Sequence, residues 1–354
     1  MRENKVVYGL IGYGGMGRWH TEILSNVPEA VIGGIYDIKE EKREEAKAKG
    51  FSVYETEEAM LADSDIDVVL IATPNDCHKP IAIRAMHAGK NVISEKPVTL
   101  SSADLLEMEK VAKETGKLFT VHQNRRWDDD FLIIKKLVEE QKLGHVFRIE
   151  SRVHGSRGIP GDWRKEKVHG GGMVLDWGVH LLDQILYMYG DRKIETVYAS
   201  LTNITNQEVD DGFTAILTFE GGTEVLVEVG TNNYISLPRW YVLGKDGTAV
   251  IRDWQLNGEI IRKTGITEEK VVPVKTAAGL TKTMAPRRED TIVKEELPHV
   301  SGDIADFHRN VAAVIRDGAE PEIKLFQVMR VMKLMEAIFQ AAETKQVIEF
   351  QDQV

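Results

Sequence analysis

The feature that most constrains this chain is a glycine-rich segment near its start. An apolar, β-branched run from Val6 to Ile11 predicts a short buried strand, and residues 12–17 then read GYGGMG. The residues that follow have the apolar spacing of a helix. In such a strand–turn–helix unit, Gly12 permits the tight turn, Gly14 lets the backbone approach a pyrophosphate, and Gly17 allows close helix packing. The amino end of the helix then faces the phosphates.

This glycine pattern is also typical of a flexible turn, so its interpretation depends on the residues that follow. A second apolar run from Ala30 to Tyr36 ends at Asp37. An acid about 20 residues past the turn is where dinucleotide-binding folds hold the ribose hydroxyls. Because a carboxylate there repels a 2′-phosphate, the sequence favours NAD over NADP, although the nearby Lys39 leaves that choice open.

The first third of the chain alternates short apolar runs with charged helical segments up to about residue 122. This alternation predicts a parallel sheet with helices on its faces. Beyond the two strands already described, the predicted strands are Ser52–Tyr54, Asp67–Ala72, Asn91–Ser94 and Lys117–Val121.

From His145 the pattern changes to long alternating segments, which predict a large, mainly antiparallel sheet. These segments are His145–His154, Glu195–Leu201, Gly212–Phe219, Thr223–Gly230, Trp240–Leu243 and Thr248–Ile251. Helices are predicted over Gly172–Tyr189, Asp303–Asp317 and Lys324–Lys345, and the polar segment 264–300 is predicted to be a surface loop. The expected fold is therefore α/β, with one domain over residues 1–124 and a second over 125–354.

Composition excludes several classes of function. The 354 residues, 42% of them hydrophobic, suffice for two domains with separate cores. A formal net charge of −11 argues against a nucleic-acid partner, and no apolar stretch approaches the roughly 18 residues that span a membrane. The single cysteine, Cys77, excludes an internal disulfide framework, and the start MRENK leaves no room for a signal peptide, so we expect a cytoplasmic protein.

A lysine is predicted to stand where a substrate would bind. In a doubly wound sheet, ligands bind beyond the carboxyl ends of the strands. The turn Glu95–Lys96–Pro97 directly follows a predicted strand, so Lys96 is expected to be held rigidly there. Its ammonium group can donate to a substrate hydroxyl and stabilise an alkoxide. A surface lysine in a turn explains the position equally well, and both interpretations remain open.

A second candidate segment, residues 170–183, reads GGGMVLDWGVHLLD. Asp176 and His180 are four residues apart, so on a helix they share one face. A histidine with a pKa near neutrality is a suitable proton acceptor, and a nearby carboxylate can fix its tautomer. A hydrogen-bonded core histidine would give the same spacing. No metal is expected, because His169, His180 and Asp176 lack HExxH or Cys-His spacing.

Together these motifs resemble the Gfo/Idh/MocA oxidoreductase family. The resemblance rests on the glycine turn with Met16 and His20, Asp37, the segment Ala72–Asn75 with His78, the Glu95–Lys96–Pro97 turn, and residues 170–183. It covers nearly the whole chain. It implies an N-terminal Rossmann domain that binds NAD and a C-terminal α+β domain with a large open, mainly antiparallel sheet. That sheet is expected to carry subunit contacts in a homo-oligomer.

The resemblance also implies roles for individual residues. His180 would take the hydroxyl proton, Lys96 would polarise the oxygen, and Asp176 would orient substrate and base. The residues expected to line the cofactor are Gly12, Gly14, Gly15, Met16, Gly17, Asp37, Thr73, Asn75, His78, Glu95, Lys96 and Gln123. Cations and aromatic residues near the expected site predict substrate contacts from Arg126, Trp127, His154, Trp163 and Arg164, beside Lys96, Asp176 and His180.

The expected activity is an NAD-dependent dehydrogenase acting on a secondary alcohol of a sugar, a glycoside or a cyclitol. Because of the aromatic-rich loops, we favour oxidation of a glycoside at C3 to a 3-keto product. Two alternatives remain open. One is a redox-neutral glycosidase or epimerase that reduces and reoxidises its nicotinamide in each cycle. The other is a non-enzymatic NAD(H)-binding regulator, which would have no need of Lys96, Asp176 and His180 together.

Overall fold

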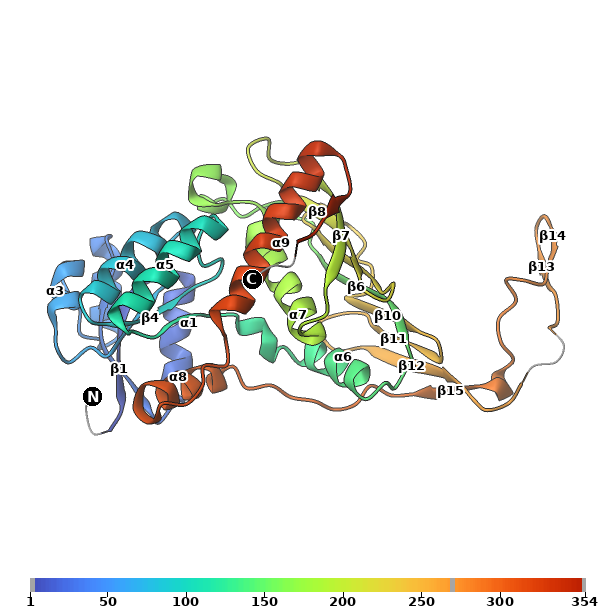
Figure 1. Cartoon of the computed structure of the whole chain (residues 1–354), viewed down its shortest axis with the longest axis horizontal. Coiled ribbons are helices and arrows are strands. Elements are labelled where there is room, and N and C mark those ends of the chain that lie inside the picture. The colour runs from blue at the N-terminus through green and yellow to red at the C-terminus, as the bar shows by residue number, and fades with distance from the viewer. Residues whose placement is uncertain (1–3, 268–270, 352–354) are drawn as a thin grey trace.

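The computed structural model describes residues 4–267 and 271–351, which form two sheets flanked by helices (Figure 1). The first sheet has five parallel strands in the order β2-β1-β3-β4-β5. Their bounds are Val6–Ile11 (β1), Ala30–Tyr36 (β2), Val68–Ile71 (β3), Asn91–Ser94 (β4) and Phe119–Val121 (β5). This parallel sheet confirms the expected Rossmann architecture.

Helices cover this sheet, and so its central strands β1 and β3 are buried along their whole length. The helices are α1 (Gly15–Leu24), α2 (Glu40–Ala48), α3 (Glu57–Ala62), α4 (His78–His87) and α5 (Ser102–Thr115). One predicted strand is wrong: residues 52–54 make only an isolated parallel bridge, between Val53 and Ile35. Two backbone hydrogen bonds form this bridge: the N–H of Ile35 donates to the carbonyl oxygen of Ser52, and the N–H of Tyr54 donates to that of Ile35, both at 2.9 Å.

The second sheet has nine strands, in the order β15-β12-β11-β10-β6-β9-β8-β7-β16. All neighbours are antiparallel except β6 and β9, so the expected mainly antiparallel sheet is confirmed. The bounds are Val146–His154 (β6), Ile194–Thr202 (β7), Gly212–Phe219 (β8), Glu224–Gly230 (β9), Trp240–Gly244 (β10), Gly247–Ile251 (β11), Gly258–Lys263 (β12), Ile292–Glu295 (β15) and Ile348–Glu349 (β16).

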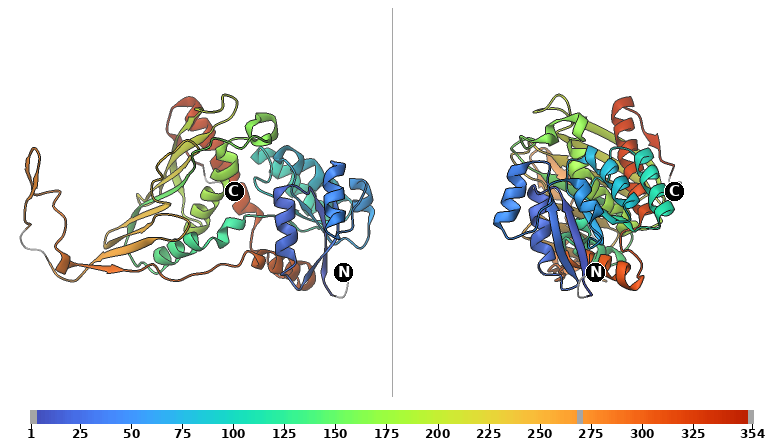
Figure 2. Two further views of the ribbon diagram at one scale, coloured as in Figure 1. Left: turned by 180° about the vertical axis from the view of Figure 1, so that it is seen from behind. Right: turned by 90° about the vertical axis from the view of Figure 1, so that its left-hand side faces the viewer.

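One face of the large sheet is packed against helices, and the other is not (Figures 1 and 2). The packed face carries α7 (Val179–Tyr189) and α9 (Leu325–Thr344), with α6 (Asp129–Glu139) beside them. The strands β8 and β9 alternate buried and partly exposed residues, as expected for a sheet with one covered face.

Two predicted elements differ from the structure. The predicted helix Gly172–Tyr189 begins with a π-helical turn, Val174–Gly178, before α7. The predicted surface loop 264–300 contains β15 and a separate hairpin, β13 (Val274–Thr276) and β14 (Gly279–Thr281), which projects far from both sheets (Figure 2). Strands β13, β14 and β15 have only three or four residues each, which is too short for a pattern of alternating apolar and polar residues to predict them.

The last two helices connect the two sheets. Helix α8 (Ala305–Asp317), which lies in the predicted second domain, packs on α1, β1 and β2 of the first sheet. Helix α9 contacts α5 and β5 as well as α7 and β7. At the start of α5, Ser102 donates its backbone N–H and its hydroxyl to the carboxylate of Glu336, at 2.7 and 2.8 Å. Across the described residues, none of the helices is both long and apolar enough to cross a lipid bilayer.

Candidate active site

The glycine turn has the geometry of a phosphate cradle. Gly12 has a φ of +96°, and a Cβ there would lie 2.5 Å from the carbonyl oxygen of Ala72. A Cβ on Gly17 would collide with the carbonyl oxygen of Gly12, so helix α1 packs tightly against the turn. At Gly14 and Gly15, by contrast, a Cβ would meet nothing within 4 Å. Open space beside the first N–H groups of a helix suits a pyrophosphate.

Asp37 lies directly beside this turn. Its Oδ2 accepts a hydrogen bond from the backbone N–H of Tyr13 at 2.7 Å, and its Oδ1 accepts from the N–H of Lys39 at 2.9 Å. The carboxylate is partly exposed, so further lone pairs can receive hydroxyl groups. The next residue, Ile38, is 83% exposed, which provides an apolar surface beside the acid.

The lysine turn faces the segment that carries Asp176. The Lys96–Pro97 peptide bond is cis. Lys96 Nζ donates to the backbone oxygen of Asp176 at 3.0 Å and lies 3.5 Å from Asp176 Oδ1. Arg164 Nε lies 3.2 Å from the same Oδ1. Burial opposes ionisation of Asp176, but the charges of Lys96 and Arg164 outweigh it and hold the pKa of this carboxyl below its ordinary value.

His180 is held as a neutral imidazole. The side chain is 5% exposed, and its Nδ1 is buried without a hydrogen-bond partner among the described residues. Burial, followed by the nearby charges of Lys96 and Arg125, lowers the pKa of His180 well below its ordinary value. A neutral imidazole can accept a proton through any ring nitrogen that a bound ligand reaches.

Asp176 does not hold His180, contrary to the expectation from their spacing. The carboxylate of Asp176 contacts Lys96 and Arg164, and His180 packs against the ring of Trp177, with centroids 5.9 Å apart. Asp176 lies in the π-helical turn, which changes the angular relation of residues four apart. The structure thus pairs the carboxylate with the cations of the site.

Hydrogen bonds join the turn that follows β3 to the lysine turn and to the triple glycine at residues 170–172. The ring of His78 bonds to the carbonyl oxygens of Pro97 and Thr73, at 2.9 and 3.0 Å. Asn75 Nδ2 donates to the carbonyl oxygen of Gly170 at 2.9 Å. These bonds connect the turn after β3 to the lysine turn and to the triple glycine before Asp176. The side chains of His78 and Asn75 therefore hold these segments next to one another.

Behind the lysine turn lies a buried cluster that sequence reasoning did not assemble. Glu95 Oε1 bonds to the rings of His20 and His122, at 2.7 and 2.9 Å, and Glu95 Oε2 accepts from the N–H of Lys96 at 3.2 Å. His308 of α8 lies 3.4 Å from His20. Burial is the largest influence on Glu95, but the hydrogen bonds and charges of His122 and His20 outweigh it and hold the pKa of the carboxyl well below its ordinary value.

The same cluster is the one group of potential metal ligands within the described ranges of the chain. Ligand atoms of His20, His122 and His308 lie within 4.8 Å of one another. Most of their ring nitrogens already bond to Glu95, to each other or to Tyr8. We interpret the cluster as a hydrogen-bonded support for Lys96 that joins α1, β5 and α8.

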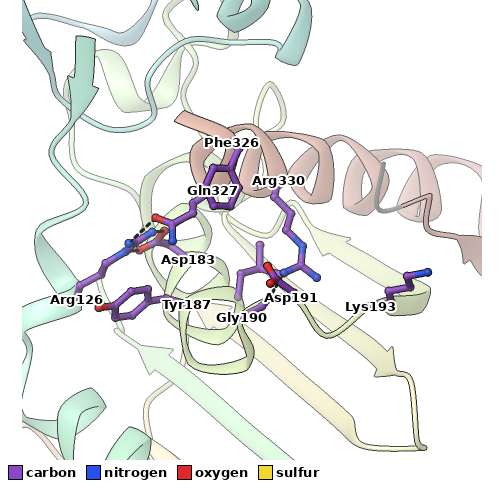
Figure 3. A pocket seen from close by; sticks show the side chains of 10 residues that line it. Arg126, Asp183, Tyr187, Gly190, Asp191, Lys193, Phe326, Gln327 and Arg330 are labelled. Atoms are coloured by element: carbon purple, nitrogen blue, oxygen red, sulfur yellow. Dashed lines mark hydrogen bonds and ion pairs between the residues drawn. The ribbon is translucent and has the colours of Figure 1, made fainter. Parts of the chain in front are cut away.

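Arg126, predicted to contact substrate, is engaged elsewhere. Its guanidinium forms a bidentate pair with Asp183, with Nε–Oδ2 at 2.8 Å and Nη2–Oδ1 at 2.7 Å, and both side chains are buried. Nη1 donates to Gln327 of α9 at 3.0 Å. The pair lines a pocket of about 220 Å³ between α7 and α9 (Figure 3). That pocket contains neither Lys96 nor His180, and it is smaller than the roughly 300 Å³ typical of ligand sites.

The other predicted substrate residues divide into two groups. Trp127 packs edge-on against Phe307, and His154 bonds to Glu228 at 3.1 Å, so both have partners within the protein. Arg164, in contrast, reaches Asp176 and stacks on Trp163, with its guanidinium carbon 4.6 Å from the ring centroid. Arg164 and Trp163 are therefore placed beside the catalytic candidates.

Sequence reasoning missed an aromatic–cationic group next to His180. The guanidinium of Arg125 lies 4.1 Å from the ring centroid of Trp177 and 5.7 Å from that of Trp254. Trp254 is 49% exposed, so part of this surface is open. The adjacent arginines 125 and 126 offered a signal, but only the fold distinguishes the one beside the site from the one that pairs with Asp183.

Comparison with known proteins agrees with this geometry. Residues 6–123 match the model of the oxidoreductase family with an NAD-binding Rossmann fold, and residues 131–250 match the GFO/IDH/MocA C-terminal domain. The crystal structure of an NAD-binding protein from Listeria innocua superposes with a TM-score of 0.94 and 49% identity, covering 98% of this chain and 100% of that one.

Two curated relatives are named as inositol dehydrogenases. The scyllo-inositol 2-dehydrogenase (NADP⁺) IolW of Bacillus subtilis is 27% identical, over 96% of this chain and 94% of its own length. The myo-inositol 2-dehydrogenase of Thermotoga maritima is 30% identical, over 60% of this chain and 65% of its own. With both domains matched in order and a solved relative sharing almost half of its residues, the chain belongs to the Gfo/Idh/MocA family of oxidoreductases.

Proposed function

We propose that this protein is a nicotinamide-dependent dehydrogenase that oxidises a secondary alcohol of a cyclitol or sugar, or reduces the matching ketone. The observation that carries the proposal is the neutral His180, whose buried Nδ1 has no partner in the described structure, beside the ammonium group of Lys96. A proton acceptor next to a cationic hydrogen-bond donor is what oxidation of an alcohol requires.

The residues fit a bound nicotinamide dinucleotide. The space at Gly14 and Gly15 faces the amino end of α1, where a pyrophosphate is stabilised. Bound there, the nicotinamide supplies the hydride acceptor. Asp37 stands at the ribose position, and its carboxylate disfavours a 2′-phosphate, so we propose NAD as the preferred cofactor. The B. subtilis relative is named for NADP⁺, which makes this preference a point to test.

In the proposed reaction, the substrate hydroxyl donates to a ring nitrogen of His180, which takes the proton as the carbon loses hydride. The ammonium group of Lys96 has three N–H donors. Two of them donate to Asp176, one to its backbone carbonyl oxygen and one to its carboxylate. The third is available to the substrate oxygen and stabilises the negative charge that develops on it. Asp176, which also pairs with Arg164, holds the ammonium group in position.

The proposed substrate class is a hydroxyl-rich ring. Inositols are the first candidates because both curated relatives are named for them. Glycosides oxidised at C3 are the second, because Trp163, Trp177 and Trp254 offer ring faces on which the apolar face of a sugar can stack.

A spectrophotometric panel tests this function. The purified protein is incubated with NAD or NADP and a series of inositols, pyranoses and glycosides, and reduced cofactor is followed by absorbance. We expect turnover with at least one polyol and a higher kcat/KM with NAD. His180→Ala should lower kcat by about 10²- to 10⁴-fold, the usual contribution of a general base.

The outcomes separate the competing functions. Equal turnover by His180→Ala would contradict the role of this histidine. Product formed without net reduced cofactor would indicate a redox-neutral hydrolase or epimerase. Calorimetry that detects dinucleotide binding, but neither polyol binding nor turnover, would identify a non-enzymatic cofactor-binding protein.

A further inference from the structure

The segment between β12 and β15 is much longer than its connection requires. These strands are antiparallel neighbours with Lys263 opposite Ile292, and the N–H of Thr264 donates to the carbonyl oxygen of Thr291 at 2.9 Å. Two strands in this register can be joined by a two-residue turn. Instead, they are joined by residues 265–290, called the arm below, whose described parts, 265–267 and 271–290, extend away from the body (Figures 1 and 2). Closing the hairpin therefore does not explain the arm.

The arm buries little of its own apolar surface. Its strands β13 and β14 pair with each other and, within the described part of the chain, with neither large sheet. Val272, Leu280 and Met284 are 70%, 74% and 80% exposed. Holding such a segment in one conformation costs backbone entropy that only burial of surface can offset. Apolar side chains gathered on an extended segment indicate a contact with another molecule.

The charge of the arm indicates an acidic partner. By sequence, residues 265–290 hold five basic and four acidic residues, a formal net charge of +1, whereas the whole chain has a formal net charge of −11. The positive residues Lys275, Lys282 and Arg287 lie in the part of the arm between residues 271 and 287, which has neither Asp nor Glu, so this part is electrostatically complementary to the acidic body of another copy. A nucleic acid would be repelled by the body itself.

The position of the arm agrees with a second copy as its partner. It leaves from β12 and β15 at one edge of the nine-stranded sheet. The face of that sheet without helices includes the exposed Phe147 and Tyr198, at 45% and 42%. In a two-fold pair the same patch meets itself, so docking through this face would carry each arm alongside the partner body.

We propose that the arm is a clasp that packs against the acidic body of a second copy of this chain. The proposal is independent of the reaction that the protein catalyses. Each protomer gives one arm and receives one, so the exposed leucine, valine and methionine side chains become buried only in the assembly.

Removing the arm tests the clasp. In one variant, Asn-Gly joins Thr264 directly to Thr291, which keeps the β12–β15 hairpin closed. Sedimentation velocity over a range of protein concentrations should give a subunit dissociation constant at least tenfold higher than that of wild type. Circular dichroism and a melting curve check that the body is folded. An unchanged dissociation constant, or a wild-type chain that is monomeric at every concentration, would overturn the proposal.

A point substitution avoids any concern about folding. Leu280→Glu places an acid on the exposed arm and should also weaken association at least tenfold. Leu106→Glu is the matched control, because Leu106 is 55% exposed on α5, away from the arm, and should leave association unchanged. Equal behaviour of the two variants would count against the clasp.

Crosslinking identifies what the arm touches. A photoreactive amino acid replaces Leu280, and ¹⁴N- and ¹⁵N-labelled copies are mixed before irradiation. Mass spectrometry should find peptides in which residue 280 of one isotope is joined to the body of the other. Crosslinks within a single copy, no crosslinks, or crosslinks that appear only after adding nucleic acid or another protein would each refute the second copy as partner.

Discussion

At the scale of single residues, the site depends on charge that is balanced almost entirely within the protein. Lys96 and Arg164 share the carboxylate of Asp176, and Arg164 also pairs with Asp162, so two cations face two carboxylates on this side of the site. His180 is buried among groups that disfavour its protonation. Its neutral state is therefore a property of its surroundings, and changing one neighbour should move its pKa.

Replacing Lys96 with methionine tests this coupling. Methionine keeps much of the length of the side chain and removes the positive charge that helps to lower the pKa of His180. We expect the pKa of His180 to rise in Lys96→Met, which NMR titration of the labelled imidazole measures directly. In wild type, the acidic limb of kcat/KM for oxidation should lie below pH 6.5, the ordinary value for histidine. The residual activity of the variant should show this limb at higher pH.

The control for that experiment is Lys135→Met, a substitution on α6 that involves an ion pair with Glu139. It should leave the His180 titration unchanged. If both lysine variants titrate like wild type, Lys96 does not act on His180.

Arg126→Ala distinguishes a structural role from substrate binding. Because the buried carboxylate of Asp183 would lose its partner, we expect a loss of about 3–5 kcal/mol in the free energy of unfolding, measured with urea. At temperatures where the variant is folded, KM should be close to that of wild type. The double variant Arg126→Met/Asp183→Leu, which removes both charges, should recover part of the stability. A large rise in KM with unchanged stability would instead restore the predicted substrate contact.

At the scale of elements, periodicity predicted most of the core and failed where the backbone departs from a regular period. The apolar runs β1 to β4 and the alternating strands β6 to β11 were identifiable because each places apolar residues on a buried side. The segment 174–178 had the same apolar composition as α7, and nothing in its residues indicates a π-helical turn. The spacing of Asp176 and His180 therefore predicted their proximity but not their partners.

The buried histidine cluster should make stability depend on pH. Burial lowers the pKa of His20 and His308, whereas the unfolded chain takes up protons near 6.5. The unfolded state thus binds more protons below pH 6.5, and each such histidine lowers the free energy of unfolding by up to about 1.4 kcal/mol per pH unit. The contribution of Glu95, with its lowered pKa, is present above about pH 4.5 and is lost as the pH falls through its folded value.

Urea unfolding at pH 7.5, 6.5 and 5.5 measures this slope. His308→Phe, which removes one buried imidazole, should reduce the slope between pH 6.5 and 5.5 even though the variant is less stable overall. His87→Phe, at an exposed position, serves as the control and should keep the wild-type slope. Identical slopes for all three proteins would show that the cluster does not titrate with folding.

At the scale of the whole molecule, the sequence predicted the two sheets in their order along the chain. It did not predict that α8, near the end of the chain, packs against the first sheet. The bounds 1–124 and 125–354 remain a prediction. Helix α8 packs on β1 and α1, and His308 lies beside Tyr8 and His20. Contacts between residues about 290 positions apart leave no local pattern in the sequence. The sequence therefore could not predict that His308 packs beside His20.

The return of α8 has a consequence for synthesis of the protein. At about 5–20 residues per second, roughly 10–40 seconds pass on the ribosome between translation of β5 and of Asp317, the last residue of α8. Throughout that interval Tyr8 and His20 lack His308 of α8, which packs against them in the complete structure. The packing of the first sheet is therefore completed only after α8 has been synthesised. A nascent chain stalled before residue 305 should be a substrate for chaperones.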